Sequence, residues 1–351
     1  MDFQRSLPVG EEGKKNSCIS RFPKPMMSPE KAFLERFDPY FQRINDELGK
    51  SLGSDISIID DIAHYSLLGE GKRLRPLLFI LSSQLCGYIG EEIYHLSTLF
   101  EYIHVASLLH DDVLDDAEMR RKKPSVRHVW GNPAAILGGD FLYAQASSIV
   151  AECHNQDMNE LLGRMTKRMV EGQFLELEYT HNWHMSKDKY MEVIVAKTGE
   201  LMSAACASGA LMAGADKEAV DLLGAFGLNL GIAFQLVDDL LDYTSSEDVM
   251  GKPVGKDLRE GKITLPLIYL LAELQEDEAE GLEELFKNRK ARVDDYRNLF
   301  TTVRGRGIIA KIETEAAGYV NRASGFLEYF STSPSKTDLL ELGDYILTRR
   351  H

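Results

Sequence analysis

The stretch LLHDDVLDDAEMRR, residues 108–121, gathers four carboxylates at the end of an apolar segment. Asp111 and Asp115 are spaced to lie one turn apart on one helix face, with Asp112 and Asp116 as a second pair. Like charges at this spacing destabilise a helix, and burial increases the penalty. Mg²⁺ removes the repulsion, since it prefers oxygen ligands and is typically held by one or two carboxylates plus substrate phosphates. The pattern indicates a metal site; the alternative is a solvated acidic helix end.

A second run, FQLVDDLLDY, repeats the pattern with Asp238, Asp239 and Asp242 among apolar residues. Asp238 and Asp242 again share a helix face. Two such runs make the solvated interpretation less favoured. If the runs face each other, they would hold a small cluster of Mg²⁺ ions between them, and the ligand suited to such a cluster is a diphosphate.

A basic loop fits that ligand. The segment GEGKRLRP places Lys72, Arg73 and Arg75 just before Pro76. Proline suits the first turn of a helix, and a helix N-terminus favours anions. Arginine adds fork-shaped hydrogen bonding to phosphate. An ordinary solvated loop is the competing interpretation.

Three further cations are ambiguous when each is considered alone. Arg120 and Arg121 follow the first acidic run, where they could reach phosphate oxygens or interact with the helix C-terminus. Lys197, in VAKTGEL, belongs to a different helix and by itself would be an unremarkable surface lysine.

Histidines near the first acidic run also have two interpretations. His104 lies two turns before Asp111 on the same face, although a lone histidine there is usually a core residue. The pair His110-Asp111 resembles the H-D pair of metal phosphohydrolases, with His64 as a weak further ligand. That reaction would leave the second acidic run and the basic loop unexplained.

The elements that must position these side chains are helices. From Ser28 onward apolar residues recur at helical spacing, and residues 91–116 and 218–243 are apolar around most of the circumference, as in buried bundle helices. Alternating strand patterns bounded by tight turns are missing. The sequence predicts a leader over 1–27 followed by one all-α domain over 28–351.

Composition narrows the class of protein. The net charge of -15 argues against a nucleic-acid partner. Four scattered cysteines without a C-x-x-C pair argue against a disulfide scaffold or structural zinc. No uninterrupted apolar stretch reaches the ~20 residues of a membrane span, and the leader lacks a secretory pattern. We therefore expect a cytoplasmic protein, at most in peripheral contact with a membrane.

Taken together, the motifs resemble the trans-isoprenyl (polyprenyl) diphosphate synthases, among them the octaprenyl and other long-chain enzymes. The segments GKRLRP, LLHDDVLDDAEMRR, GNPAAILGGDFL, AKTGEL and GIAFQLVDDLLDY...GKPVGKDLREGKITLPL occur in that family's order and spacing from about Ser28 onward. The resemblance implies an all-α bundle around a deep central cavity, a homodimer, and Mg²⁺-dependent condensation of isopentenyl diphosphate with an allylic diphosphate.

The resemblance also implies residue roles. The expected catalytic and metal-binding carboxylates are Asp111 and Asp115 with Asp238 and Asp242, and Asp112 and Asp239 complete the candidate ligands of more than one Mg²⁺. The expected allylic-diphosphate contacts are Arg120, the catalytic Lys197, Thr198, Gln235, Lys252 and Lys262. The expected isopentenyl-diphosphate contacts are Lys72, Arg75, His104 and Arg121. The family often has Gly-Lys where this chain has Lys122-Lys123, which should alter loop geometry more than chemistry.

Product length is expected to depend on residues just before the first acidic run, where bulky aromatics close the cavity in short-chain members of the family. Here these positions hold Ile103, Ala106 and Ser107. Small side chains predict a deeper tunnel and a medium or long polyprenyl product, with Ala106→Phe shortening it. Farnesyl or geranylgeranyl diphosphate is the alternative product.

Two other functions remain open at this stage. A class I terpene cyclase shares the first acidic run but typically replaces the second and needs no isopentenyl site. A non-catalytic subunit of a heteromeric synthase usually lacks one acidic run. Both runs are intact here, which favours chain elongation.

Overall fold

The computed structural model describes residues 33–50, 54–68, 71–244, 255–287 and 291–349. The expected leader, 1–27, and Lys252 lie outside these ranges. In the first half the helices are α2 (Asp38–Lys50), α3 (Ser57–Leu67), α4 (Leu74–Leu85), α5 (Ile93–Leu114), α6 (Val126–Trp130), α7 (Asn132–Glu152) and α8 (Gln156–Tyr179). Strands β1 (Met119–Arg120) and β2 (Lys123–Pro124) pair antiparallel after α5.

The second half is also helical. Its elements are α9 (Lys187–Ile194), the π-helical turn η1 (Val195–Gly199), α10 (Glu200–Met212), α11 (Lys217–Thr244), α13 (Lys256–Arg259), α14 (Leu265–Glu273), α15 (Glu276–Lys287), α16 (Val293–Gly305), α17 (Ile308–Phe326), η2 (Leu327–Tyr329) and α18 (Pro334–Thr348). The expected all-α fold class is confirmed. Local sequence explains several helix starts; for example, the Asn155 side chain accepts the Met158 N–H at 3.0 Å and so caps α8.

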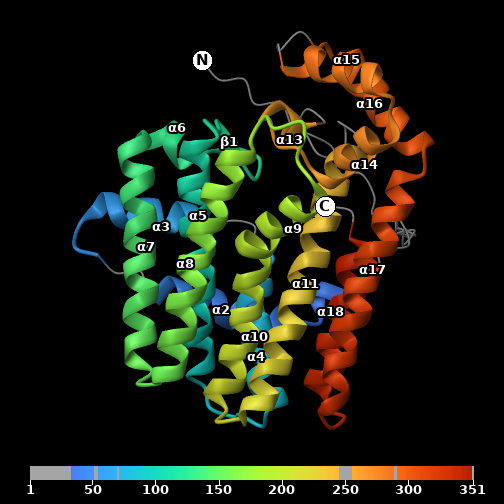
Figure 1. The fold of residues 1–351 in the computed structure, drawn as a ribbon. Coiled ribbons are helices and arrows are strands. Elements are labelled where there is room, and N and C mark those ends of the chain that lie inside the picture. The colour runs from blue at the N-terminus through green and yellow to red at the C-terminus, as the bar shows by residue number, and fades with distance from the viewer. Residues whose placement is uncertain (1–32, 51–53, 69–70, 245–254, 288–290, 350–351) are drawn as a thin grey trace, which may run out of the picture.

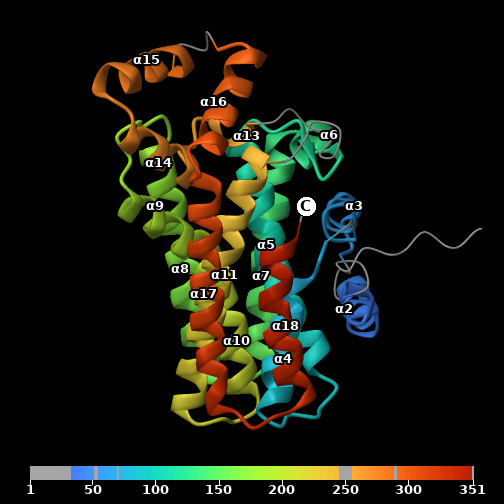
Figure 2. The same ribbon diagram turned by 90° about the vertical axis from the view of Figure 1, so that its right-hand side faces the viewer.

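The long helices stand side by side as a bundle, with α15 and α16 projecting beyond one end (Figures 1 and 2). Helix α5 packs against α7, α10 against α4 and α11, and α11 against α17. Two buried apolar clusters meet along α11, because Leu230 and Ala233 belong to one and Ile232 and Leu236 to the other. This central helix therefore carries the second acidic run through the middle of the bundle.

The acidic ends of α5 and α11 lie at the same end of the bundle, near α13 (Figure 1). Close packing of Gly231 against Gly199 fixes how near α11 lies to η1 at this end of the bundle. A Cβ added to Gly231 would lie 2.8 Å from the Cα of Gly199, so α11 and η1 approach backbone to backbone. This contact brings the residues after Gly231 beside Lys197 and Thr198, which belong to η1.

Helices α7 and α11 are long and apolar enough to cross a membrane if only length and composition are considered. In the fold, 39% and 50% of their respective apolar windows are buried inside the molecule. Because a buried core helix meets the same criteria as a membrane span, these two helices give no ground for placing the chain in a membrane.

Candidate active site

A cavity of about 1340 Å³ opens between α5, α7, α8, α11 and the η1 turn. Its volume exceeds the roughly 300–1,000 Å³ of ordinary small-molecule sites, so it has room for an elongated ligand. Most residues predicted from the sequence line it, namely Lys72, Arg75, Ile103, His104, Ser107, Asp111, Arg120, Arg121, Lys197, Thr198, Gln235, Asp238, Asp239 and Lys262. Four predicted residues do not line it in the described part of the chain: Ala106, Asp112, Asp115 and Asp242.

The carboxylates of the first acidic run have different surroundings. Asp111 faces the cavity, and burial raises its pKa. Asp112 is 2% exposed and accepts a hydrogen bond from Arg120 Nε at 2.8 Å. Helix α5 ends at Leu114, and Asp115 follows as its C-cap. Only Asp111 of this run therefore lines the cavity directly, while Asp112 holds Arg120.

Asp115 connects the first acidic run to the segment after α13. Its carboxylate pairs with Lys262 Nζ at 2.8 Å, and Lys262 also pairs with Glu260 at 3.0 Å. Burial lowers the pKa of Lys262, but Glu176, Asp115 and Glu260 outweigh it and raise that pKa overall. Lys262 is thus a charged ammonium group at the cavity wall.

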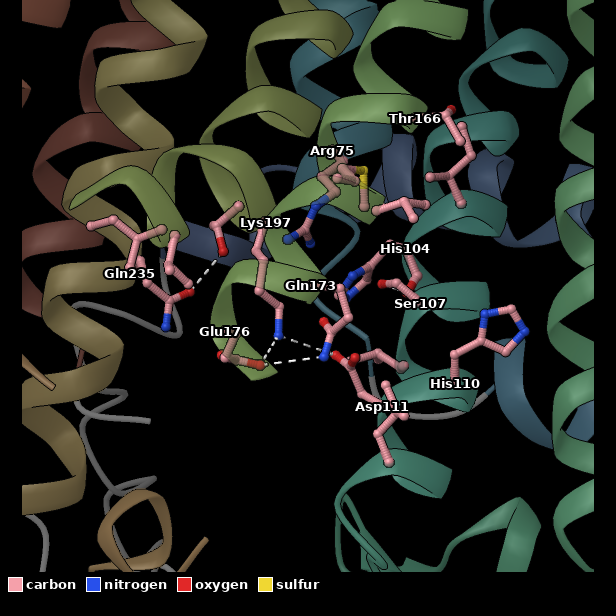
Figure 3. Close-up of a pocket in the computed structure, with 18 of the residues that line it drawn as sticks. Arg75, His104, Ser107, His110, Asp111, Thr166, Gln173, Glu176, Lys197 and Gln235 are labelled. Atoms are coloured by element: carbon pink, nitrogen blue, oxygen red, sulfur yellow. Dashed lines mark hydrogen bonds and ion pairs between the residues drawn. The ribbon is translucent and has the colours of Figure 1, made fainter. Parts of the chain in front are cut away.

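Lys197 lies between two carboxylates on different helices (Figure 3). Its Nζ pairs with Glu176 of α8 and lies 3.9 Å from Asp111 Oδ2. Gln173 donates to the same Glu176 carboxylate at 3.4 Å. Glu176 had no role in the sequence predictions, yet it fixes the lysine beside the first acidic run.

Lys197 and Thr198 are positioned by an irregular backbone segment. The turn η1 is π-helical, a conformation that is rare and often marks functional sites. A wider turn inserts an extra residue into the helix and changes which side chains face inward. Both Lys197 and Thr198 line the cavity from this turn.

In the second acidic run, Asp238 is the most accessible carboxylate. It is 39% exposed and pairs with Arg349 Nη2 at 2.6 Å. The Arg349 guanidinium is buried, lies 3.7 Å from the Phe234 ring centroid and donates to the Phe234 carbonyl at 2.7 Å. Arg349, which follows α18, therefore reaches the cavity, and no pattern in the sequence predicted this.

Asp239 lines the cavity but is largely buried in a hydrogen-bonded network. It is 4% exposed and accepts from Tyr190 Oη at 2.5 Å and from Gln235 Nε2 at 2.8 Å. Gln235 in turn accepts from Thr198 Oγ1 at 2.8 Å. Burial raises the pKa of Asp239 to about 7, and the two hydrogen bonds only partly oppose this. A cation nearby would favour the ionised form of this carboxylate and so offset the energetic cost of its burial.

The side chain of Asp242 is engaged by backbone groups of the segment that starts α13. It accepts backbone N–H groups from Lys256 at 3.0 Å and from Asp257 at 3.1 Å, at the start of α13. Its side chain therefore caps this short helix and does not point into the cavity. Asp257 does line the cavity, and burial together with Asp242 and Asp239 raises its pKa well above the usual range.

The cations expected to bind isopentenyl diphosphate line the same cavity as the carboxylates. Lys72, Arg75 and Arg121 line the same cavity as His104. The Nε of Arg75 is buried without a hydrogen-bond partner in the described part of the chain. Burial lowers the pKa of Arg75 to about 10, opposed by Glu101 and Asp238. Burial, then Arg75 and Arg121, keep the pKa of His104 well below its usual range, so His104 is neutral at neutral pH.

These carboxylates by themselves would supply only part of the ligand set of a metal ion. Among the described residues, no group of three or more His, Cys, Asp or Glu side chains is gathered closely enough to hold an ion. Asp111, Asp238 and Asp239 nevertheless line one cavity, and their hard oxygen donors suit Mg²⁺. The donor set fits a metal whose remaining ligands come from a substrate phosphate and water, rather than a complete protein cage.

Away from the two acidic runs, the cavity continues between α5, α7 and α8. Figure 3 places Ser107 between Asp111 and Thr166, and the lining continues through Val150, Leu162 and Gly163. Ile103 and Ser107 therefore lie on the expected path of a growing chain, and their effect on product length stays a prediction.

Ala106 is different: it is 0% exposed and belongs to the packed core. Because helical neighbours one residue apart point in different directions, Ser107 faces the cavity and Ala106 does not. Ala106 thus lies outside the described lining of the cavity, and its expected effect on product length stays a prediction.

Comparison with known proteins identifies the family. A model of the polyprenyl synthetase family matches residues 45–303. The chain is 35% identical over 266 residues to octaprenyl diphosphate synthase from Haemophilus influenzae, covering 75% of this chain and 81% of that protein. It is 36% identical over 266 residues to geranylgeranyl diphosphate synthase from Sulfolobus acidocaldarius, covering 73% and 81%.

Among solved structures, the fold is similar to a polyprenyl synthase from Caulobacter crescentus CB15 complexed with calcium and isoprenyl diphosphate. The TM-score is 0.86 at 35% identity, and the match covers 94% of this chain and all of that one. Fold and sequence thus agree on one family.

Proposed function

This chain belongs to the polyprenyl synthetase family and is a prenyltransferase that elongates isoprenoid chains. From this premise we propose which of its residues bind each of the two diphosphate substrates. The allylic diphosphate binds beside Asp111, Asp238 and Lys197, and isopentenyl diphosphate binds at the cationic cluster. The observation that carries this assignment is that one cavity is lined both by carboxylates suited to a metal and by the cations Lys72, Arg75 and Arg121.

The reaction follows from charge. The allylic C–O bond breaks with its electron pair going to the departing diphosphate, and the double bond of isopentenyl diphosphate attacks the allylic cation. Loss of one proton then gives a product one isoprene unit longer. Preorganised cations facing the diphosphate stabilise the charge that develops on it. Arg120, Lys197 and Lys262 supply part of this charge, with Asp112, Glu176 and Asp115 holding them in place.

We propose Mg²⁺, more than one ion per site, as the divalent metal. Asp111 and Asp238 are the carboxylates best placed to hold it, with Asp239 behind them. When bound, Mg²⁺ would neutralise the diphosphate and assist its departure. Thr198 and Gln235 extend the hydrogen-bond network from Asp239 toward the reacting end of the substrate.

The neighbouring subsite takes isopentenyl diphosphate at Lys72, Arg75 and Arg121. The unpartnered Nε of Arg75 supports this assignment, since a buried donor without an acceptor is unfavourable unless a ligand supplies one. His104 is neutral and can donate one hydrogen bond without adding a further charge.

A medium or long polyprenyl product suits the length of the cavity. Its lining on α8 extends from Glu176 down to Asn159, about 25 Å along the helix. An extended isoprene unit spans about 5 Å, from four carbon–carbon bonds of about 1.5 Å, so about five units fit between these two residues. Farnesyl and geranylgeranyl chains, with three and four units, would leave the lower end empty.

A homodimer would complete the cavity. Val170, Phe174 and Leu177 line it from α8, yet they are 47%, 69% and 46% exposed. Apolar side chains that line the cavity and are also exposed on the outer surface mark a site of contact with another apolar surface, which would shield them from water. A second copy of the chain, related by a twofold axis, is the simplest source of that surface.

The remaining partners follow the sequence predictions. The net charge of -15 speaks against nucleic acid. We place the protein in the cytoplasm, and Cys86, Cys153 and Cys206 being free thiols is in keeping with a reducing compartment. A peripheral membrane contact would let a long apolar product leave the cavity without crossing water.

The decisive experiment incubates the purified protein with Mg²⁺, labelled isopentenyl diphosphate and farnesyl diphosphate, followed by product sizing. Elongated diphosphates with chains beyond four units are expected. If folded protein gives no elongated product with geranyl, farnesyl or geranylgeranyl diphosphate, the proposed function is wrong. A cyclic hydrocarbon made from the allylic substrate alone would instead indicate a terpene cyclase.

A further inference from the structure

Arg73 stands apart from the other cations of the basic loop because it is almost completely buried, at 3% exposure. Its Nη1 pairs with Glu101 Oε1 of α5 at 2.5 Å, and its Nε donates to Asn45 Oδ1 of α2 at 3.0 Å. Its Nη2 donates to the carbonyl of Leu67, the last residue of α3. One guanidinium thus connects three helices to the start of a fourth.

The backbone of Arg73 is unusual as well. It precedes α4 with φ of 48°, in the left-handed region that a non-glycine residue adopts only at an energetic cost. The N-cap position makes no side-chain capping bond. The three guanidinium contacts connect this turn to α2, α3 and α5.

The turn lies between the two cations assigned to isopentenyl diphosphate. Lys72 precedes Arg73 directly, and Arg75 follows two residues later in the first turn of α4. Both line the cavity. A change of φ at Arg73 would rotate Lys72 relative to Arg75, so the geometry of the pair depends on this one residue.

The guanidinium groups of Arg73 and Arg121, the third cation of that subsite, both lie close to the same side of Gly71. A Cβ on Gly71 would lie 2.4 Å from Arg73 Nη1 and 3.2 Å from Arg121 Nη1. The loop backbone at Gly71 therefore passes close to both guanidinium groups. Glu101 supplies the opposite charge beside them, and its carboxylate opposes the effect of burial on the pKa of Arg75 and Arg121.

We propose that Arg73 is a positioning residue: held by Glu101, Asn45 and the Leu67 carbonyl, it fixes the left-handed turn that presents Lys72 and Arg75 to isopentenyl diphosphate. This inference rests on the proposed function and assigns Arg73 no contact with the substrate. It also separates Arg73 from its neighbours in GKRLRP, which look equivalent in the sequence.

The test compares Arg73→Gln and Arg73→Lys with wild type, measuring kcat and KM for each substrate separately, and isopentenyl diphosphate binding by calorimetry. In Arg73→Gln, KM for isopentenyl diphosphate is expected to rise about tenfold, equivalent to about 1.4 kcal/mol, with KM for the allylic substrate changing less than twofold. Arg73→Lys keeps the charge and should recover part of the loss. Arg36→Gln, which removes an ion-pairing arginine on the outer surface, is the matched control and should leave both KM values unchanged.

If Arg73→Gln does not fold, Asn45→Ala removes one of the three acceptors and should raise the same KM about threefold. Equal rises in both KM values, or no change in either, would overturn the positioning role. Wild-type protein that fails to elongate any primer would instead contradict the proposed function, so the two failures are distinguishable.

Discussion

The carboxylate of Asp242 accepts the backbone N–H of Asp257 at 3.1 Å, so the last aspartate of the second acidic run closes the segment that carries Lys262. Lys262 then pairs with Asp115, the third aspartate of the first run. Asp242 and Asp115 are thereby connected through protein groups. The aspartates that begin the runs, Asp111 and Asp238, line the cavity together with Asp239.

Asn and Ala substitutions at Asp242 separate a capping role from a metal-binding role. Asp242→Ala removes the acceptor of two backbone amides and should lower the free energy of unfolding by about 1 kcal/mol, with lower activity. Asp242→Asn keeps an acceptor oxygen and should retain most of the stability and turnover. Thermal denaturation and steady-state rates check both. If the two variants lose activity equally while remaining equally stable, Asp242 acts as a metal ligand.

Asp111→Ala and Asp238→Ala should lower turnover by about two orders of magnitude or more. Each removes a carboxylate proposed to hold Mg²⁺ beside the diphosphate, where negative charge develops in the reaction. Their circular dichroism spectra should remain those of the folded bundle. Asp116→Ala is the matched control, because Asp116 is exposed and pairs only with Arg127 at the surface. Turnover near the wild-type level in either cavity variant would remove that residue from the proposed site.

Metal removal is expected to abolish activity without unfolding the protein. Among the described residues, no three His, Cys, Asp or Glu side chains are gathered closely enough to hold an ion by themselves, and we expect the fold to be stable without a metal. EDTA should eliminate turnover, Mg²⁺ should restore it, and Tm in the absence of substrate should be unchanged. A large fall in Tm on chelation would show that a structural metal site exists.

Ser107 and Ala106 are adjacent and should respond differently to the same substitution. Ser107→Phe places an aromatic ring in the cavity and should shorten the product distribution. Ala106→Phe overpacks a buried site and should lower the free energy of unfolding by about 1–3 kcal/mol instead. Product sizing and thermal denaturation are the two measurements. A shortened product from stable Ala106→Phe would confirm the role expected for Ala106 from the sequence.

Charge on the exposed face of α8 should disrupt the proposed dimer. Phe174→Glu introduces a carboxylate where the apolar wall needs a cover, and light scattering should report a smaller mass than for wild type. Ile89→Glu, at a 94% exposed position between α4 and α5, is the control and should leave the mass unchanged. Wild-type protein that is monomeric at micromolar concentration would contradict the dimer.

The sequence by itself determined the helical fold class and the chemistry of the site. Apolar periodicity is a local property that fixes where helices bury a face, and two Asp-rich runs at helical spacing already specify oxygen donors for a metal. The predicted cluster of Lys72, Arg75, His104 and Arg121 does line the same cavity as Asp111 and Asp238.

Only the tertiary structure decided which of several like residues faces the cavity. Asp242 and Asp238 share a motif, but the return of residues 256–257 makes the first a helix cap and leaves the second accessible. Arg73 is buried against Glu101, 28 residues away, while Arg75 lines the cavity with an unpartnered Nε. Such differences depend on contacts between segments far apart in the chain. Spacing along one helix says which side chains share a face, and only packing says what that face meets.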